Sequence, residues 1–183
     1  MQVQDLIISA AGSSRIAAEY GCYIMKELEI FNSVSVFDPA MITPNLLTDM
    51  KYGGLLTVSQ SGSGKDLIDA LKLAYRHNLT CFNLVNVESS PITQVINQVQ
   101  KEIADEDQAR KKANKATVLY DASDSDDEID GVKFQDKNIG IYQKSGHCYS
   151  DIKSFIPQIV TLTLVALWFS DYKQRQTSLS FEQ

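Results

Sequence analysis

The fold of this chain is decided by the stretch Leu55-Leu56-Thr57-Val58-Ser59-Gln60-Ser61-Gly62-Ser63-Gly64. Its first four residues form an apolar run of the kind that makes a buried parallel strand. A polar, glycine-containing loop follows at once. From Asp66 onward the apolar residues Leu67, Leu71, Ala74 and Tyr75 fall on one side of a helix. The stretch therefore predicts a strand, a tight loop and a helix in immediate succession.

The same succession occurs near the N-terminus. Residues 6–8 are an apolar run that ends in the small residues 9–14. A helix is expected next, because apolar side chains recur there at a spacing of four, at Ile16, Tyr20, Ile24 and Leu28. We expect this stripe to face the core.

Three more strands are expected, at residues 33–37, 80–85 and 117–120. A short helix is expected from Pro44, and residues 91–115 mostly favour helix. Alternating strands and helices predict an α/β protein. We expect a three-layer sandwich with a five-stranded parallel sheet of flavodoxin-like order and helices on both faces. One domain over residues 1–175 is predicted, with a tail at 176–183.

An acidic segment interrupts this pattern. Between Asp121 and Asp130 there are six acidic residues and one large apolar side chain, Ile129. Such a composition cannot bury enough surface to order itself, so we expect a mobile acidic insertion at 121–138. A solvated linker is the plainer interpretation, and phosphorylation of Ser123 and Ser125 is the sharper one.

The composition narrows the class of protein. The 183 residues are 44% hydrophobic and 22% charged, which is ordinary for one globular domain. A formal net charge of -6 disfavours nucleic acid as a partner. Cys22, Cys81 and Cys148 are widely spaced, so no zinc site is expected.

Targeting signals are also not evident. The first residues lack the pattern of a secretory signal, and we expect a cytoplasmic protein. The apolar stretch at 155–169 is shorter than the roughly 20 residues that a membrane span needs. A buried helix, and no membrane partner, is the expectation.

The two glycine-containing loops suggest an anion site. In an open parallel sheet, ligands bind beyond the carboxyl ends of the strands, where loops meet helix N-termini. Free backbone N–H groups and the positive end of the helix dipole favour a phosphate there. Ser59, Ser61 and Ser63 add hydroxyl groups, while Gly62 and Gly64 let the backbone approach closely. The pattern predicts phosphate binding without a metal or a cofactor.

Nucleotide-binding interpretations fail on the same residues. A P-loop needs a glycine at the position of Ser59 and a serine or threonine at that of Asp66. A dinucleotide site needs three glycines in the first loop, where only Gly12 occurs.

One family shares these motifs. Residues 59–66, SQSGSGKD, resemble the SQSGETxD loop of the sugar-isomerase (SIS) domains in glutamine:fructose-6-phosphate aminotransferases, which make glucosamine 6-phosphate. Residues 10–14, AAGSS, are similar to the family's ACGTS. Asn86-Val87 with Ser89-Ser90 resembles its NVxGSS, and residues 153–155 with Gln158 resemble its STKAFTxQ. The resemblance runs from Leu6 to about Asp171, apart from insertions around 98–115 and 121–145.

The resemblance implies a sugar-phosphate site. The loop and the first helix N-terminus would hold the phosphate, Val87 would contact the sugar through its backbone, and Lys153 would add a further contact. The residues so implied are Gly12, Ser13, Ser14, Ser59, Gln60, Ser61, Ser63, Gly64, Val87 and Lys153.

Two positions of the loop depart from the family. Ser63 replaces its glutamate and Gly64 its threonine, and Asp151-Ile152 replace the serine and threonine before Lys153. The lost hydroxyl at Gly64 removes one phosphate donor. We hypothesise that Lys65 or Ser63 compensates.

The resemblance leaves open whether the chain is an enzyme. The chain resembles the first of the family's two isomerase units, whereas the base, histidine and Schiff-base lysine of the family belong to the second unit and the tail after it. His147 has no acidic partner at helical spacing. No catalytic residue is therefore assigned.

Three functions follow from these observations. The first is the N-terminal half of a fructose-6-phosphate aminotransferase/isomerase module that is part of a longer enzyme. The second is a non-catalytic module that senses fructose 6-phosphate or a related hexose phosphate. The third, a self-sufficient isomerase, lacks a visible base. A homodimer, or pairing with a second SIS unit through residues such as Trp168 and Phe169, is expected.

Overall fold

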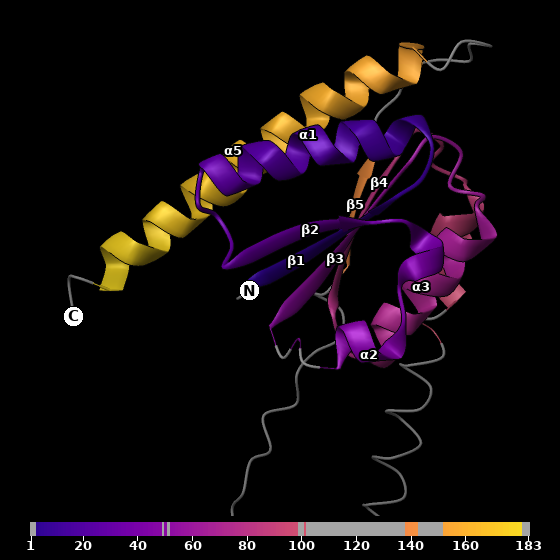
Figure 1. The fold of residues 1–183 in the computed structure, drawn as a ribbon, viewed down its shortest axis with the longest axis horizontal. Helices are drawn as coiled ribbons and strands as arrows, with labels where there is room; N and C mark the ends of the chain where they lie inside the picture. The colour runs from indigo at the N-terminus through magenta and orange to yellow at the C-terminus, as the bar shows by residue number, and fades with distance from the viewer. Residues whose placement is uncertain are drawn as a thin grey trace, which may run out of the picture.

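The protein is built on one parallel sheet (Figure 1). In this computed structural model the described residues are 3–48, 50, 52–98, 101, 138–142 and 152–180. The strands are β1 (Asp5–Ala10), β2 (Ser33–Phe37), β3 (Gly53–Ser59), β4 (Thr80–Val85) and β5 (Asn138–Tyr142). Their order is β2-β1-β3-β4-β5, with every neighbouring pair parallel. The expected α/β class and flavodoxin-like order are confirmed.

Helices cover both faces of the sheet. Helix α1 (Ser13–Glu27) and helix α5 (Ile152–Ser180) pack against each other over one face (Figure 1). The other face carries α3 (Lys65–Arg76), α2 (Pro44–Leu47) and the 3-10 turn η1 (Pro39–Met41). Residues 91–98 are also helical. The result is the three-layer sandwich that the alternation predicted.

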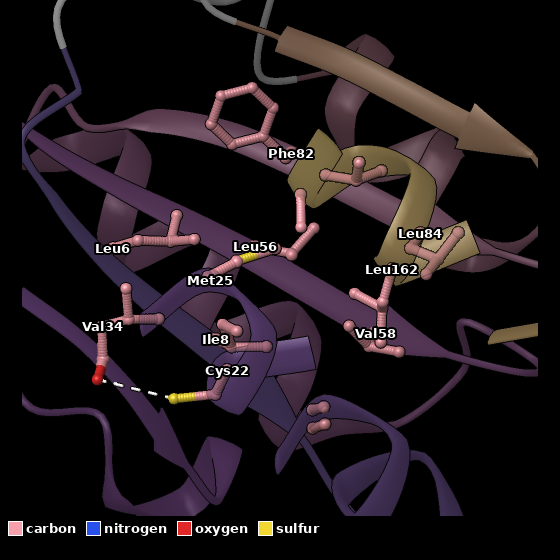
Figure 2. Packing of buried hydrophobic residues seen from close by; sticks show 14 of the residues in the cluster. Leu6, Ile8, Cys22, Met25, Val34, Leu56, Val58, Phe82, Leu84 and Leu162 are labelled. Carbon is pink, nitrogen blue, oxygen red and sulfur yellow. Dashed lines mark hydrogen bonds between the residues drawn. The ribbon is translucent and has the colours of Figure 1, made fainter. Parts of the chain in front are cut away.

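The sheet is apolar on both faces, which explains the unbroken apolar runs of its central strands. Leu6, Ile8, Leu56, Val58 and Phe82 belong to the core under α1 and α5, where Met25 and Leu162 meet them (Figure 2). Residues of opposite parity, such as Ile7, Leu55 and Cys81, belong to the core under α3. Each face thus receives alternate residues of the same strands.

The expected core stripe of α1 is wrong. Ile16, Tyr20 and Leu28 are exposed to 60%, 44% and 38%, and Ile24 is half-buried. The buried face instead consists of Ser14, Ala17, Ala18, Gly21, Cys22 and Met25. These small residues let α1 lie close to the sheet and to α5; a Cβ on Gly21 would be 3.1 Å from the Cβ of Leu162. The larger apolar side chains were therefore assigned to the wrong face.

The edge strand also differs from expectation. The expected strand at 117–120 and most of the expected acidic insertion lie outside the described residues. Strand β5 begins at Asn138, where that insertion was expected to end, and it pairs with β4. This strand was not predicted. The one-domain division and the tail remain predictions, although helix α5 continues unbroken through Ser180.

Phe169 does not face a partner. Its ring lies 5.1 Å from that of Phe31 and 5.2 Å from that of Phe82, centroid to centroid, and the side chain is buried in the core. Trp168, the neighbouring residue, is half exposed, and its contact with a partner stays a prediction. The outward side chains of α5 come from a different set, which includes Leu164.

Helix α5 is longer than the apolar stretch expected at 155–169. Within it, Ser154–Arg175 is long and apolar enough to cross a membrane by length and composition alone. A third of the most apolar 18-residue window is buried inside the protein, and the core helix of a soluble protein passes the same test. The buried side of α5 packs on the sheet, so this helix belongs to the sandwich.

Candidate functional site

Two loops meet at one edge of the sheet. Strands β1 and β3 are neighbours in register, with Ala10 beside Val58. The loop after β1 leads through Gly12 into α1, and the loop at residues 59–64 leads into α3. Because parallel strands end on the same side, both helix N-termini lie at this edge. The structure thus brings Gly12, Ser13 and Ser14 to the same edge as the serine loop.

Hydrogen bonds within the serine loop fix its shape. The Gly62 N–H donates to Ser59 Oγ at 3.0 Å, and the Ser63 N–H donates to Ser61 Oγ at 3.3 Å. The hydroxyl oxygens of Ser61 and Ser63 lie 2.8 Å apart. Both of these side chains are exposed, so their hydroxyl groups are accessible to an anion.

The segment after β4 holds this loop from behind. The Asn86 N–H donates to the Gln60 carbonyl at 3.3 Å, and the Ile92 N–H donates to the Gly62 carbonyl at 3.0 Å. Gly62 has φ +62°, and a Cβ on it would lie 2.8 Å from Ser90 Cβ. The close approach and the left-handed backbone both require glycine at this position.

Neither helix N-terminus at this edge is capped by a side chain. Within the described residues, Gly12 is the N-cap of α1 and Gly64 that of α3, and neither position makes a side-chain capping bond. The first N–H groups of each helix therefore point outward without a side-chain acceptor. Such groups, together with the helix dipole, favour an anion.

Ser14 has a different environment from the loop serines. It is buried, and Gln158 Nε2 donates to its Oγ at 3.0 Å. This bond joins the first turn of α1 to the first turns of α5 beneath the candidate site. Gln158 itself is 1% exposed, so the pair has no competing water.

The remaining expected site residues are spread more widely. Val87 lies in the turn after β4, and its carbonyl accepts from the Ser90 N–H at 3.1 Å. Lys65 is exposed at the first position of α3. Lys153 is the second residue of α5, and its side chain lies outside the described part, as does His147.

Two residues without a role expected from the sequence support the loops of the candidate site. Ser90, buried against Gly62, and Gln158, bonded to Ser14, both occur in the motifs that resemble the SIS family. Their buried contacts come from parts of the chain far apart in sequence, so only the resemblance pointed to them.

The acidic side chains nearest to the loop in sequence are exposed: Asp66 follows it in the first turn of α3, and Glu88 lies in the turn after β4. Within the described part of the chain there is no cluster of three or more His, Cys, Asp or Glu side chains that could hold a metal. The thiol of Cys22 has a raised pKa because burial disfavours its thiolate, with Lys26 opposing the shift. Cys22 belongs to the core under α1, not to the loop edge (Figure 2).

A groove of about 450 Å³ lies between η1 and α3, lined by Pro39, Ile42, Asp69, Leu73 and Arg76 among others. None of residues 59–64 lines it. The candidate anion site is therefore an exposed loop edge and not this groove.

Solved structures share this fold. The C-terminal domain of glucosamine-fructose-6-phosphate aminotransferase from Francisella tularensis matches with a TM-score of 0.63 at 17% identity, over 99% of this chain and 41% of that one. The NanR protein of Vibrio vulnificus, complexed with ManNAc-6P, matches with a TM-score of 0.56 at 16% identity, over 99% of this chain and 56% of that one. An E. coli CFT073 protein in complex with a phosphosugar matches with a TM-score of 0.56 at 14% identity, over 93% of this chain and 71% of that one. The chain therefore shares the SIS fold of these solved structures.

The sequence itself is similar to one enzyme in particular. Over 97 residues it is 30% identical to a protein of Acanthamoeba polyphaga mimivirus named as a probable isomerizing glutamine--fructose-6-phosphate aminotransferase. That match covers 53% of this chain and 16% of the viral protein, so the chain corresponds to a small part of its relative. No protein-family model matches the chain. The expected resemblance to this aminotransferase is confirmed.

Proposed function

We propose that this chain binds a phosphorylated sugar, with the phosphate held by the serine loop at residues 59–64. The observation that carries the proposal is the meeting of two uncapped helix N-termini with the exposed hydroxyl groups of Ser61 and Ser63 at one sheet edge. Backbone N–H groups and neutral hydroxyls bind a phosphate dianion without a metal. The sugar-phosphate ligands of NanR and of the E. coli protein support this class of ligand.

We further propose that the chain is the first isomerase unit of a fructose-6-phosphate aminotransferase module. The mimivirus relative supports this assignment. In that reaction a base moves a proton between C1 and C2 of the opened sugar. In this assignment the unit binds the phosphate, and a second unit supplies the base, as the resemblance to the aminotransferases implies. A cytoplasmic location fits this role.

A non-catalytic sensing module is the second candidate. It is favoured by two residues of the serine loop, Ser63 and Gly64, which replace the glutamate and the threonine of the resembled aminotransferases. A module of this kind would bind hexose phosphate without turnover. Turnover by the full-length protein would separate the two candidates.

Thermal unfolding in the presence of phosphosugars tests the binding proposal. Fructose 6-phosphate, glucose 6-phosphate or glucosamine 6-phosphate at millimolar concentration should raise the melting temperature, because a ligand of the folded state stabilises it by mass action. The Ser61→Ala variant should bind about ten-fold more weakly, which corresponds to one lost charge-assisted hydrogen bond. Asp69→Ala, which alters an exposed residue of α3 away from the loop, is the control. Unchanged affinity in Ser61→Ala, or no shift with any sugar, would refute the assignment.

Gly64→Thr should strengthen binding. Threonine is the residue of the resembled family at this position, and the backbone at Gly64, with φ -62° and ψ 123°, accepts a side chain. An added Cβ would meet only Leu67 Cβ, at 3.7 Å. The new hydroxyl should lower the dissociation constant for the sugar phosphate by about three- to ten-fold. Titration calorimetry beside Gly64→Val, which has the same shape without the hydroxyl, checks this; equal affinities for the two variants would contradict it.

A further inference from the structure

Ser14 and Gln158 form a buried polar pair between α1 and α5, which lie side by side over the sheet (Figure 1). Gln158 Nε2 donates to Ser14 Oγ at 3.0 Å, and the two residues are 1% and 6% exposed, respectively. Burying an amide is costly unless it is hydrogen-bonded, and an apolar side chain would fill the same space without that cost. The hydrogen bond to Ser14 is therefore the feature of Gln158 that needs a role.

This hydrogen bond limits what the Ser14 hydroxyl can do. A serine hydroxyl has one proton to donate and two lone pairs that accept. The Gln158 amide occupies one lone pair, so the proton has to point elsewhere. Among the described residues, Ser14 makes no hydrogen bond besides this one. Its proton is thus a buried donor without a protein acceptor in that part of the chain.

The geometry of α1 directs this donor toward the loop edge. Side chains of an α-helix lean toward its N-terminus, and Ser14 is the second residue of α1, close to the N-cap Gly12. The first N–H groups of the helix point the same way, and no side chain caps them. An anion at this helix N-terminus would receive the Ser14 proton together with those N–H groups.

We propose that Gln158 is a positioning residue of the candidate site: by donating to Ser14 Oγ, it leaves the Ser14 proton free to bind the phosphate. The inference rests on the proposed sugar-phosphate function and adds to it a residue from the other end of the chain. The helix N-terminus and Ser14 then offer donors only. Such a set suits a phosphate dianion, in which every free oxygen is an acceptor.

Gln158→Met tests the orientation of the hydroxyl without adding a charge. Methionine has a similar length but cannot donate to Ser14, so the proton is no longer directed at the ligand. The dissociation constant for fructose 6-phosphate should rise about five- to ten-fold. In the Ser14→Ala background the same substitution should change it by less than about two-fold, because no hydroxyl remains to be oriented. Val165→Ala, which removes a core contact of α5 two turns farther along, controls for a general loosening of the helix and should not change the affinity.

Gln158→Glu reverses the hydrogen bond in a pH-dependent way. An ionised carboxylate only accepts, so it draws the Ser14 proton away from the phosphate, and its charge also repels the ligand. At about pH 8 the dissociation constant should be on the order of 100-fold above that of the wild type, and about ten-fold above its parent in the Ser14→Ala background, where only repulsion remains.

Lowering the pH should restore binding by this variant. A protonated carboxyl donates to Ser14 as the amide does, and burial raises the pKa of a carboxyl. At about pH 5.5 the dissociation constant of Gln158→Glu should therefore be less than about ten-fold above that of the wild type. Comparing the two proteins at each pH cancels the titration of the phosphate itself. A merely structural role of Gln158 predicts no such recovery.

Calorimetric titration measures these affinities on samples that circular dichroism shows to be folded. A loss in Gln158→Met that disappears in the Ser14→Ala background supports the proposal. Unchanged affinity in Gln158→Met, or an equal loss with and without the Ser14 hydroxyl, would overturn it. If Gln158→Glu does not fold, the comparison of Gln158→Met in the two backgrounds decides alone.

Two further titrations separate this inference from the sugar-phosphate proposal. If Ser61→Ala weakens binding and Gln158→Met does not, the site is correct and the role of Gln158 is wrong. If the chain binds inorganic phosphate but not fructose 6-phosphate, and the Ser14 dependence persists, the role of Gln158 is correct and the sugar assignment is wrong. A wild type that binds neither ligand would overturn both.

Discussion

Leu162→Ala should lower the free energy of unfolding by about 3–5 kcal/mol, the range for removing a fully buried leucine from a well-packed core. Leu162 is 0% exposed and lies where α5 meets both α1 and the sheet (Figure 2). Its side chain fills the space opposite Gly21, so neighbouring atoms cannot easily move into the cavity. Because small domains have only about 5–15 kcal/mol of stability, this single change should remove a large fraction of it.

The measurement is urea unfolding followed by circular dichroism. Met41→Ala, at a side chain that is 67% exposed on η1, is the control and should change stability by less than about 0.5 kcal/mol. Both variants should be compared at one protein concentration, because association also contributes to apparent stability. If Leu162→Ala lowers the free energy of unfolding by less than about 1 kcal/mol, α5 does not pack on the sheet as described. Removal of a buried leucine side chain costs about 2–5 kcal/mol.

Sequence patterns predicted the sheet better than the helices. Each central strand is apolar on both faces, so residues such as Leu55 and Leu56 gave an unbroken apolar run with no choice of face to make. On α1 the apolar periodicity correctly predicted a helix, but it indicated the wrong buried face. The helix turns Ala17, Ala18 and Gly21 toward the core. Close packing selects small side chains, and hydrophobicity alone does not reveal that selection.

The candidate site shows the same limit. The serine loop and the loop at Gly12 could be placed at one edge from the order of strands and loops. The side chains that hold these two loops in place, Ser90 and Gln158, could not be identified from sequence patterns. Their contacts join parts of the chain that are far apart in sequence. Strand β5 was missed although Ile139 and Ile141 alternate as in a strand, because the segment is only five residues long and Gly140 interrupts it.

Gly62→Ala should disrupt both the fold of the serine loop and its binding of a phosphorylated sugar. The residue has φ +62°, where an alanine costs roughly 1–2 kcal/mol. Its Cβ would also lie 2.8 Å from Ser90 Cβ and 3.0 Å from Ile92 Cγ2, and relieving such overpacking costs about 1–3 kcal/mol more. Ser90 is buried and hydrogen-bonded to Thr93, so moving it away from an added Cβ would disturb packed and bonded atoms.

Gly64→Ala, two residues away, provides the matched control. Its backbone lies in the ordinary β region and an added Cβ meets nothing closer than 3.7 Å. Alanine is a poorer N-cap than glycine, so stability should fall by about 0.5–1 kcal/mol, less than in Gly62→Ala. Because Gly62→Ala displaces the hydroxyls of Ser61 and Ser63 together, its affinity for fructose 6-phosphate should fall about 100-fold, whereas Ser61→Ala removes one donor from an intact loop. Calorimetric titration of folded samples measures both. If Gly62→Ala binds as the wild type does, the phosphate lies elsewhere, because no ligand held by this loop would tolerate the displacement of both hydroxyls.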